Sequence, residues 1–189
     1  MSTDEELIRE IQLGSHAAME VLVKRYYKMI FSYVYRKLGD YHEAYDITQE
    51  IFIKMMKHIN NYKESSKFKN WLFKIGVNSC NDYFRSRGFQ EKNSTVELKP
   101  TLKDDQGNIW DLLSRNLDRK RIKEAIEELP DHQRDALILK FYHDFKIKDI
   151  AKITDTKEAT VKSRLKQGLD KLDKIINGGG KLEEKRNRI

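Results

Sequence analysis

One stretch of the chain, residues 65–81, combines aromatic, lysine and asparagine side chains without a single acidic residue. If residues 67–87 form a helix, cations and amides recur along it three or four residues apart and fall on one line. Cations bind phosphate and amides hydrogen-bond base edges, so the line suits nucleic acid, although a plain solvated helix face is the alternative. The residues on the line are Lys67, Asn70, Lys74, Asn78, Asn81 and Arg85.

The loop before this helix, residues 60–66, offers a place for an unstacked base. Tyr62 supplies an aromatic ring, and Lys63, Ser65 and Ser66 supply a cation and short polar groups. Single strands are held by stacking on aromatic rings and by cations along the backbone. Tyr62 has an alternative role as a loop residue on the domain surface. The apolar residues of the helix have the spacing of a buried face: Phe68, Trp71, Leu72 and Ile75, with Cys80 as a small core residue beside Gly76.

A second basic segment near the C-terminus has the form of a helix-turn-helix. A short helix over 147–153, a turn at 154–156 and a longer helix over 157–176 are expected. Ala159, Val161, Leu165, Leu169 and Leu172 are predicted to face inward. The outward positions hold cations and hydrogen-bonding groups: Lys157, Thr160, Lys162, Ser163, Lys166 and Gln167. Such a second helix is typical of a major-groove reader, while a helical hairpin in a plain bundle is the alternative.

The elements that must position these residues are helices. Helical spacing predicts a first helix around Leu7, a second over 16–38 that Gly39 ends, and a third over 42–59. The third has a buried stripe of Ala44, Ile47, Ile51, Phe52, Met55 and Ile59. Helices over 117–129 and 131–142, separated by Pro130, precede the helix-turn-helix. No strand is predicted, so we expect an all-α protein.

Composition and charge limit the kinds of protein that this chain can be. It has 189 residues, a net charge of +7 and one cysteine, and no apolar run approaches a membrane span. The acidic start is not a signal peptide, and we therefore expect a cytoplasmic protein. Residues 60–90 and 119–189 are net basic, at +4 and +6, whereas residues 91–118 are net acidic. Two separate basic zones suggest a polyanion that is touched at two places.

With these motifs identified, the chain resembles a bacterial sigma factor of the small, two-domain extracytoplasmic-function (ECF) type. LGDYHEAYDITQEIFIKMMKHI, residues 38–59, resembles the family's core-polymerase-binding helix. FKNWLFKIGVNSCNDYFRSR, residues 68–87, resembles its minus-ten recognition and melting helix. ELPDHQRDALILKFYHDFKIKDIAKITDTKEATVKSRLKQGLDKL, residues 128–172, resembles its minus-thirty-five domain. The three motifs occur in the family's order and spacing, which a lone helix-turn-helix would not match.

The resemblance implies two small helical domains and a role for each site. The domains are 1–88 and 117–177, with a flexible linker over 89–116 and a disordered tail over 178–189. Asp46, Gln49 and Glu50 would contact core RNA polymerase. The loop at Tyr62, Lys63, Ser65 and Ser66 would capture a flipped non-template base, and the line from Lys67 to Arg85 would follow the strand. Lys162, Ser163, Lys166 and Gln167 would face bases of promoter DNA, while Lys157, Thr160 and Arg164 would contact phosphates. Family members are often held by an anti-sigma factor.

Three positions depart from the family's pattern: Asp155, and Thr156 and Glu158, which replace residues that are commonly apolar or small. Asp155 stands where the turn usually has glycine, and we expect it to tolerate the left-handed conformation with some strain. Glu158 places a carboxylate at the start of the recognition helix, where it repels phosphate or accepts a hydrogen bond from a cytosine amine. These changes bear on which promoter is preferred.

Two functions of different classes are the alternatives to this one. A stand-alone helix-turn-helix regulator would bind its operator without polymerase, usually as a dimer, but leaves the line on residues 67–85 unexplained. An enzyme acting on DNA, such as a recombinase, needs catalytic groups that the sequence does not offer. The five histidines, His16, His42, His58, His132 and His143, have no metal-ligand pairing, and no glycine-rich phosphate loop occurs. We therefore expect no catalysis, no metal and no other cofactor.

Overall fold

The computed structural model describes residues 2–63, 67–91 and 125–177, with only the backbone described at 87–91 and 177. The chain divides into two compact units, residues 1–102 and 103–189, and each is described by itself. In the described ranges all regular elements are helical, which confirms the predicted all-α class. Most of the predicted linker, the tail and much of the 117–129 helix lie outside these ranges, although residues 125–127 are helical.

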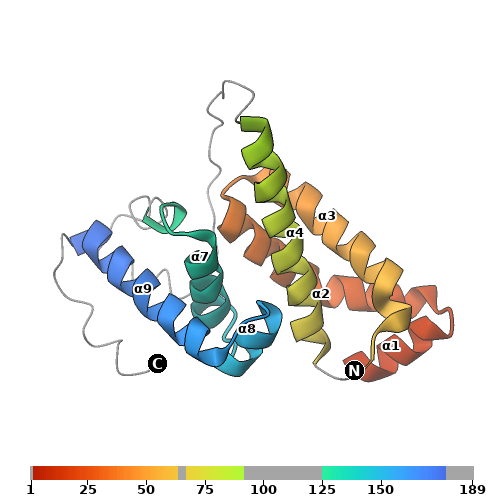
Figure 1. Ribbon diagram of the computed structural model, residues 1–189. Helices are drawn as coiled ribbons and strands as arrows, with labels where there is room; N and C mark the ends of the chain where they lie inside the picture. Colours follow the sequence, from red (N-terminus) through yellow and green to blue (C-terminus); the bar gives the residue numbers. More distant parts are fainter. Residues whose placement is uncertain (1, 64–66, 92–124, 178–189) are drawn as a thin grey trace. The chain divides into compact units, whose positions relative to one another are not determined.

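In the part of the first unit that the structure describes, there are four α-helices and a short 3-10 helix. They are α1 (Asp4–Gln12), α2 (His16–Leu38), α3 (Tyr41–His58), η1 (Ile59–Asn61) and α4 (Phe68–Glu91) (Figure 1). The predicted bounds of α2 and α3 agree with these to within one residue at each end. The helix α4 continues to Glu91 and so extends into the segment that the sequence assigns to the linker.

Local capping groups explain why α2 and α3 begin where they do. The Ser15 hydroxyl accepts a hydrogen bond from the Ala18 N–H at 3.2 Å, and the Asp40 carboxylate accepts one from the Glu43 N–H at 3.0 Å. Each side chain satisfies an N–H group that the first helical turn leaves without a backbone partner. Gly39 has a φ of 77°, a left-handed conformation that glycine adopts without steric cost, and it ends α2 as predicted.

The core of the first unit lies where α2, α3 and α4 meet. The whole predicted stripe of α3, from Ala44 to Ile59, is buried, and so is Cys80, with no exposed surface. Tyr33 of α2 and Phe73 of α4 pack edge to face, with ring centroids 5.6 Å apart. The helix α4 contacts both α2 and α3, and it therefore buries a wider arc than a surface helix with a single apolar stripe.

The second unit contains α7 (Asp131–Leu137), a π-helical turn η2 (Ile138–Tyr142), α8 (Ile147–Ile153) and α9 (Glu158–Asn177). The predicted helix over 131–142 corresponds to α7 and η2 together. The buried Arg134 guanidinium donates to the carbonyls of Ile126, Glu127 and Leu129 and so holds the segment before Pro130 against α7. The helices α7 and α9 approach closely at Gly168, where an added Cβ would lie 2.9 Å from Leu137 Cδ1.

The described ranges hold no candidate for a membrane span or for a metal site built from three side chains. None of their helices combines the length and the apolar character needed to cross a membrane. Within the same ranges, no three His, Cys, Asp or Glu side chains come together as metal ligands would.

Candidate nucleic-acid interfaces

Fewer of the cations and amides on the predicted line along α4 are exposed than the helical spacing predicts. Lys67, Asn78 and Arg85 are exposed, and Lys74 and Asn81 are partly exposed. Asn70 is only 5% exposed, so its predicted place on the outer surface is wrong. The reason is that α4 packs against two helices, and the arc that it buries reaches the edge of the predicted line at Asn70.

The side chain of Asn81 is held from inside the first unit. Lys37 of α2 is 1% exposed, and its Nζ donates a hydrogen bond of 2.7 Å to Asn81 Oδ1. The same ammonium lies 5.8 Å from the centre of the Phe84 ring, within the range of a cation–π contact. Asn81 is therefore not a freely rotating surface amide. This contact has no local signal in the sequence, because 44 residues separate its partners.

Arg85 has a close acidic neighbour on the surface of α4. Its Nη1 lies 3.5 Å from Asp82 Oδ1, and the two side chains are 81% and 61% exposed. An exposed ion pair of this kind contributes at most about 1 kcal/mol, because water screens it. Arg85 can therefore exchange this partner for a phosphate at little cost.

Tyr62 belongs to an aromatic cluster at the start of α4. Its ring centroid lies 5.1 Å from that of Trp71 and 5.7 Å from that of Phe68, and the Phe68 ring lies 5.3 Å from that of Tyr26 on α2. Tyr62 is partly exposed and Lys63 is exposed, whereas the predicted residues Ser65 and Ser66 lie outside the described ranges. Phe68 is buried, so the cluster supports the Tyr62 ring from beneath.

The helix α1 contacts the backbone on which Tyr62 sits. Gln12 Nε2 donates to the carbonyl oxygens of Ile59, at 3.2 Å, and Tyr62, at 3.4 Å. The end of α1 is thereby joined to both ends of η1. This support was not anticipated from sequence, since neither carbonyl carries a side-chain signal.

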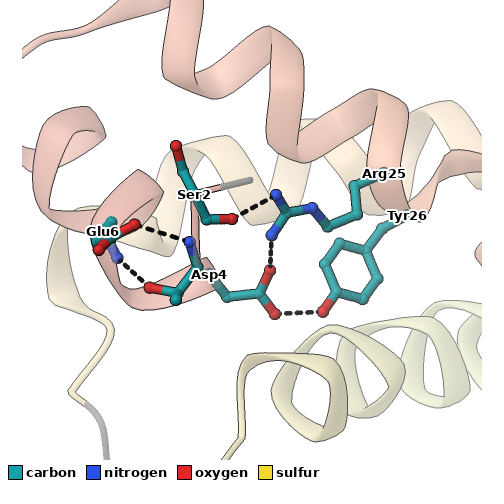
Figure 2. A network of polar contacts seen from close by, with 6 residues as sticks. Ser2, Asp4, Glu6, Arg25 and Tyr26 are labelled. Carbon is teal, nitrogen blue, oxygen red and sulfur yellow. Dashed lines mark hydrogen bonds and ion pairs between the residues drawn. The ribbon is translucent and has the colours of Figure 1, made fainter.

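The start of α1 is tied to α2 by a polar network around Asp4 (Figure 2). Asp4 accepts a hydrogen bond from the Tyr26 hydroxyl and an ion-pairing contact of 2.6 Å from Arg25, which also donates to the Ser2 carbonyl at 2.7 Å. Burial and the hydrogen bond to the Asp4 carboxylate both raise the pKa of Tyr26, burial having the larger effect. The capping box of Thr3 and Glu6 is the one part of this arrangement that the sequence signals.

The predicted polymerase-contacting residues lie on the exposed face of α3, away from its buried stripe. Asp46, Gln49 and Glu50 are all exposed, and their spacing places them side by side on the helix. Apolar side chains are exposed on the same helix: Tyr41 at 47%, Tyr45 and Ile53 at 44%, and Met56 at 42%. These four residues are not among the predicted contacts, and none of them belongs to the buried stripe.

The helix-turn-helix of the second unit forms as predicted. Asp155 has a φ of 53°, so the expected left-handed turn residue is confirmed. The Thr154 hydroxyl donates to the Ile150 carbonyl at 2.8 Å, which closes the end of α8. Ala151 of α8 is buried, as are Val161 and Leu165 of α9. Ala159, which was predicted to face inward, is instead exposed.

The outward face of α9 presents most of the predicted reading residues to solvent. Lys157, which precedes the helix, is exposed, as are Thr160, Lys162, Ser163, Lys166 and Gln167, while Arg164 is partly exposed. Gln167 bridges its neighbours: its Nε2 donates to Ser163 Oγ at 3.0 Å, and its Oε1 accepts from Gln133 Nε2 at 3.1 Å. Two candidate base-reading side chains are thus oriented before any DNA binds.

Comparison with known proteins identifies both units. Residues 22–90 match the family model of sigma-70 region 2, and residues 119–172 match that of sigma-70 region 4. The RNA polymerase sigma-H factor of Pseudomonas aeruginosa is 28% identical over 92% of this chain and 93% of its own length. The ECF RNA polymerase sigma-E factor of Escherichia coli strain K12 is 29% identical over 92% of this chain and 94% of its own.

Solved structures share the fold. The sigma factor RpoE of Bartonella quintana, solved with the anti-sigma factor NepR, has a TM-score of 0.70 and 22% identity, covering 82% of this chain and 94% of that one. CnrH, solved with the cytosolic domain of CnrY, has a TM-score of 0.67 and 17% identity, covering 92% of this chain and 97% of that one. From both matched regions and these relatives we conclude that the chain belongs to the ECF sigma factors, the small two-domain specificity subunits of bacterial RNA polymerase.

Proposed function

We propose that the two units of this sigma factor bind different partners and different promoter elements. Residues 1–88 bind core polymerase and melt the minus-ten element, residues 117–177 bind the minus-thirty-five element, and residues 89–116 link them. The observation that carries the proposal is made at α4: Asn78 and Arg85 are exposed on this helix, and exposed Lys67 lies just before it, on the side of the Tyr62 ring.

The aromatic cluster supplies the energy for capturing a base. Taking a base out of its stack costs a few kcal/mol, and stacking on an aromatic ring returns about 1–3 kcal/mol. Tyr62 offers its partly exposed ring, and Lys63, Ser65 and Ser66 complete the loop in the proposal. Lys67, Lys74, Asn78, Asn81 and Arg85 then hold the separated strand. Asn70 is not among the residues proposed to hold the strand, because it is buried.

The exposed face of α3 is proposed to bind core polymerase. Asp46, Gln49 and Glu50 give it polar specificity, and the exposed Ile53 and Met56 give it apolar area. Interfaces commonly combine an apolar centre with a polar rim, and this face has both kinds of residue.

The helix α9 is proposed to read the minus-thirty-five element in the major groove. Lys162, Ser163, Lys166 and Gln167 face the bases, and Lys157, Thr160 and Arg164 contact phosphates. Support comes from their exposure and from the basic character of the helix-turn-helix.

The proposal extends to partners and location. RpoE and CnrH are each described in a complex with another protein, NepR being an anti-sigma factor, and we propose that an anti-sigma factor also holds this chain. The protein works in the cytoplasm beside polymerase and promoter DNA. It performs no catalysis and needs no cofactor, since polymerase supplies the chemistry.

Run-off transcription tests this proposal. Bacterial core polymerase is assayed with and without the protein on promoters from its own genome, and new start sites are expected only when it is added. A variant with Lys74, Asn78 and Arg85 changed to alanine is expected to lose open complexes while retaining binding to core polymerase. Tight binding of the protein alone to duplex DNA, without new start sites, would instead favour a stand-alone regulator.

A further inference from the structure

The contact between Lys37 and Asn81 fixes which side of the Asn81 amide faces outward. A side-chain amide has an oxygen that accepts hydrogen bonds and a nitrogen that donates them, whereas a lysine ammonium can only donate. Lys37 is buried, and its Nζ lies 2.7 Å from Asn81 Oδ1. Turning the amide over would place N–H groups against an ammonium, so the oxygen stays inward.

The outward atom of Asn81 is therefore the nitrogen, a hydrogen-bond donor. Asn81 is partly exposed and lies three residues after exposed Asn78 and four before exposed Arg85, which places all three on one line of α4. We propose that Lys37 is a positioning residue that makes Asn81 a dedicated donor, so that this sigma factor prefers a promoter base presenting an acceptor edge.

The chemistry of base edges says which bases such a donor selects. On this edge guanine presents O6 and N7 as acceptors and thymine presents O4, adenine presents the N7 acceptor beside its N6 amino donor, and cytosine presents only an amino donor at N4. An amide that is free to rotate can serve either kind of base and discriminates poorly. One that is locked by Lys37 disfavours cytosine, which offers no acceptor on this edge, and pairs best with guanine or thymine, which offer no competing donor there. This inference rests on the proposed function, because it requires α4 to lie against the minus-ten region.

Two substitutions test whether Lys37 locks the amide. Asn81→Asp keeps an oxygen for Lys37 but replaces the outward donor with an acceptor. Lys37→Met removes the donor that locks the amide and leaves Asn81 in place. We expect the first to reverse the preference at one promoter position towards cytosine or adenine, by about five- to tenfold. The second should weaken the base preference at that same position, because the released amide can then present either its oxygen or its nitrogen.

The readout is the base preference in run-off transcription by holoenzyme on promoters randomised across the minus-ten region. Asn78→Asp serves as the charge-matched control, since it adds the same negative charge on the same line without facing Lys37. A loss common to both aspartate variants reflects repulsion from phosphate and counts against the inference. A reversal at one position with Asn81→Asp alone supports it.

A failure of the proposed function and a failure of the inference about Asn81 give different results. If the unmodified protein gives no promoter-dependent initiation, the proposed function itself is wrong. If it initiates and Asn81→Asp leaves every base preference unchanged, only the role of the locked amide is overturned. Thermal unfolding of Lys37→Met shows whether that variant folds, and Asn81→Asp decides the question if it does not, because it retains the pairing with Lys37.

Discussion

Two glycines inside helices illustrate how much a single position depends on its neighbours. Gly76 of α4 and Gly168 of α9 are both buried, and their flanking residues alone do not tell them apart. A Cβ at Gly76 would lie 3.8 Å from Ile51 and Tyr33, which is ordinary contact distance. One at Gly168 would lie 2.9 Å from Leu137 Cδ1, and Leu137 is itself only 3% exposed.

Alanine at these two positions is expected to have opposite effects. Gly76→Ala should raise the free energy of unfolding by up to about 1 kcal/mol, because alanine favours helix and its methyl group fits at ordinary contact distance. Gly168→Ala should lower it by about 1–2 kcal/mol, because the strain of overpacking exceeds the gain in propensity. Urea unfolding of the full chain measures both. Equal effects would contradict the close approach of α7 and α9.

At the scale of elements, α1 acts as a brace between distant parts of the first unit. Its start is bound to α2 through Asp4 and Tyr26, and its end reaches η1 through Gln12. The rings of Tyr26 and Tyr62 both contact the ring of Phe68, which connects the same two regions a second time. The backbone beside the proposed base-capturing ring is thus held by a helix that precedes the matched sigma-70 region.

The Tyr26 contact is expected to make this brace sensitive to high pH. The folded protein raises the pKa of Tyr26 above its ordinary value of 10.0. The contribution of the Tyr26 hydroxyl to the free energy of unfolding is therefore complete below about pH 10 and is lost as the pH rises further. Tyr26→Phe should cost about 1–3 kcal/mol at pH 7, since it removes a hydrogen bond to a carboxylate. It should also weaken the alkaline loss. Urea unfolding from pH 7 to 11 tests this, and an unchanged alkaline slope would contradict it.

The elements were largely predictable from the sequence, but their contacts were not. The bounds of α2 and α3 follow from local signals, namely the caps at Ser15 and Asp40 and the glycine at position 39. The burial of Asn70 was not predictable, because it depends on α4 having neighbours on two sides. Likewise, the exposure of Ala159 reflects its position at the start of α9 rather than its apolar character.

At the scale of the whole molecule, the net charge and its distribution over the two units govern the attraction to DNA. The net charge of +7 favours DNA of any sequence, so the choice of promoter must come from a few oriented side chains. Within the second unit, Lys157 is proposed to contact phosphate, whereas Gln167, which is held by Ser163 and Gln133, is proposed to contact a base.

Salt dependence should distinguish these two kinds of residue. Lys157→Ala is expected to reduce the slope of log affinity against log salt by about 0.9 while leaving the minus-thirty-five preference unchanged. Gln167→Ala should change the preference and leave the slope unchanged. Holoenzyme binding to promoter DNA over a range of salt measures both, with Lys174→Ala, an exposed cation late in α9, as the control. A Lys157 variant with an unaltered slope would remove that residue from the phosphate contacts.

The buried Lys37 has a consequence for how promoter preference evolves. It never reaches the surface, yet in our proposal it sets what Asn81 offers to DNA. A mutation in the interior of α2 could then redirect a sigma factor to a different group of genes while all of its DNA-facing residues stay the same. Paralogues with identical recognition surfaces need not share a regulon, and the inherited difference would be found in the core.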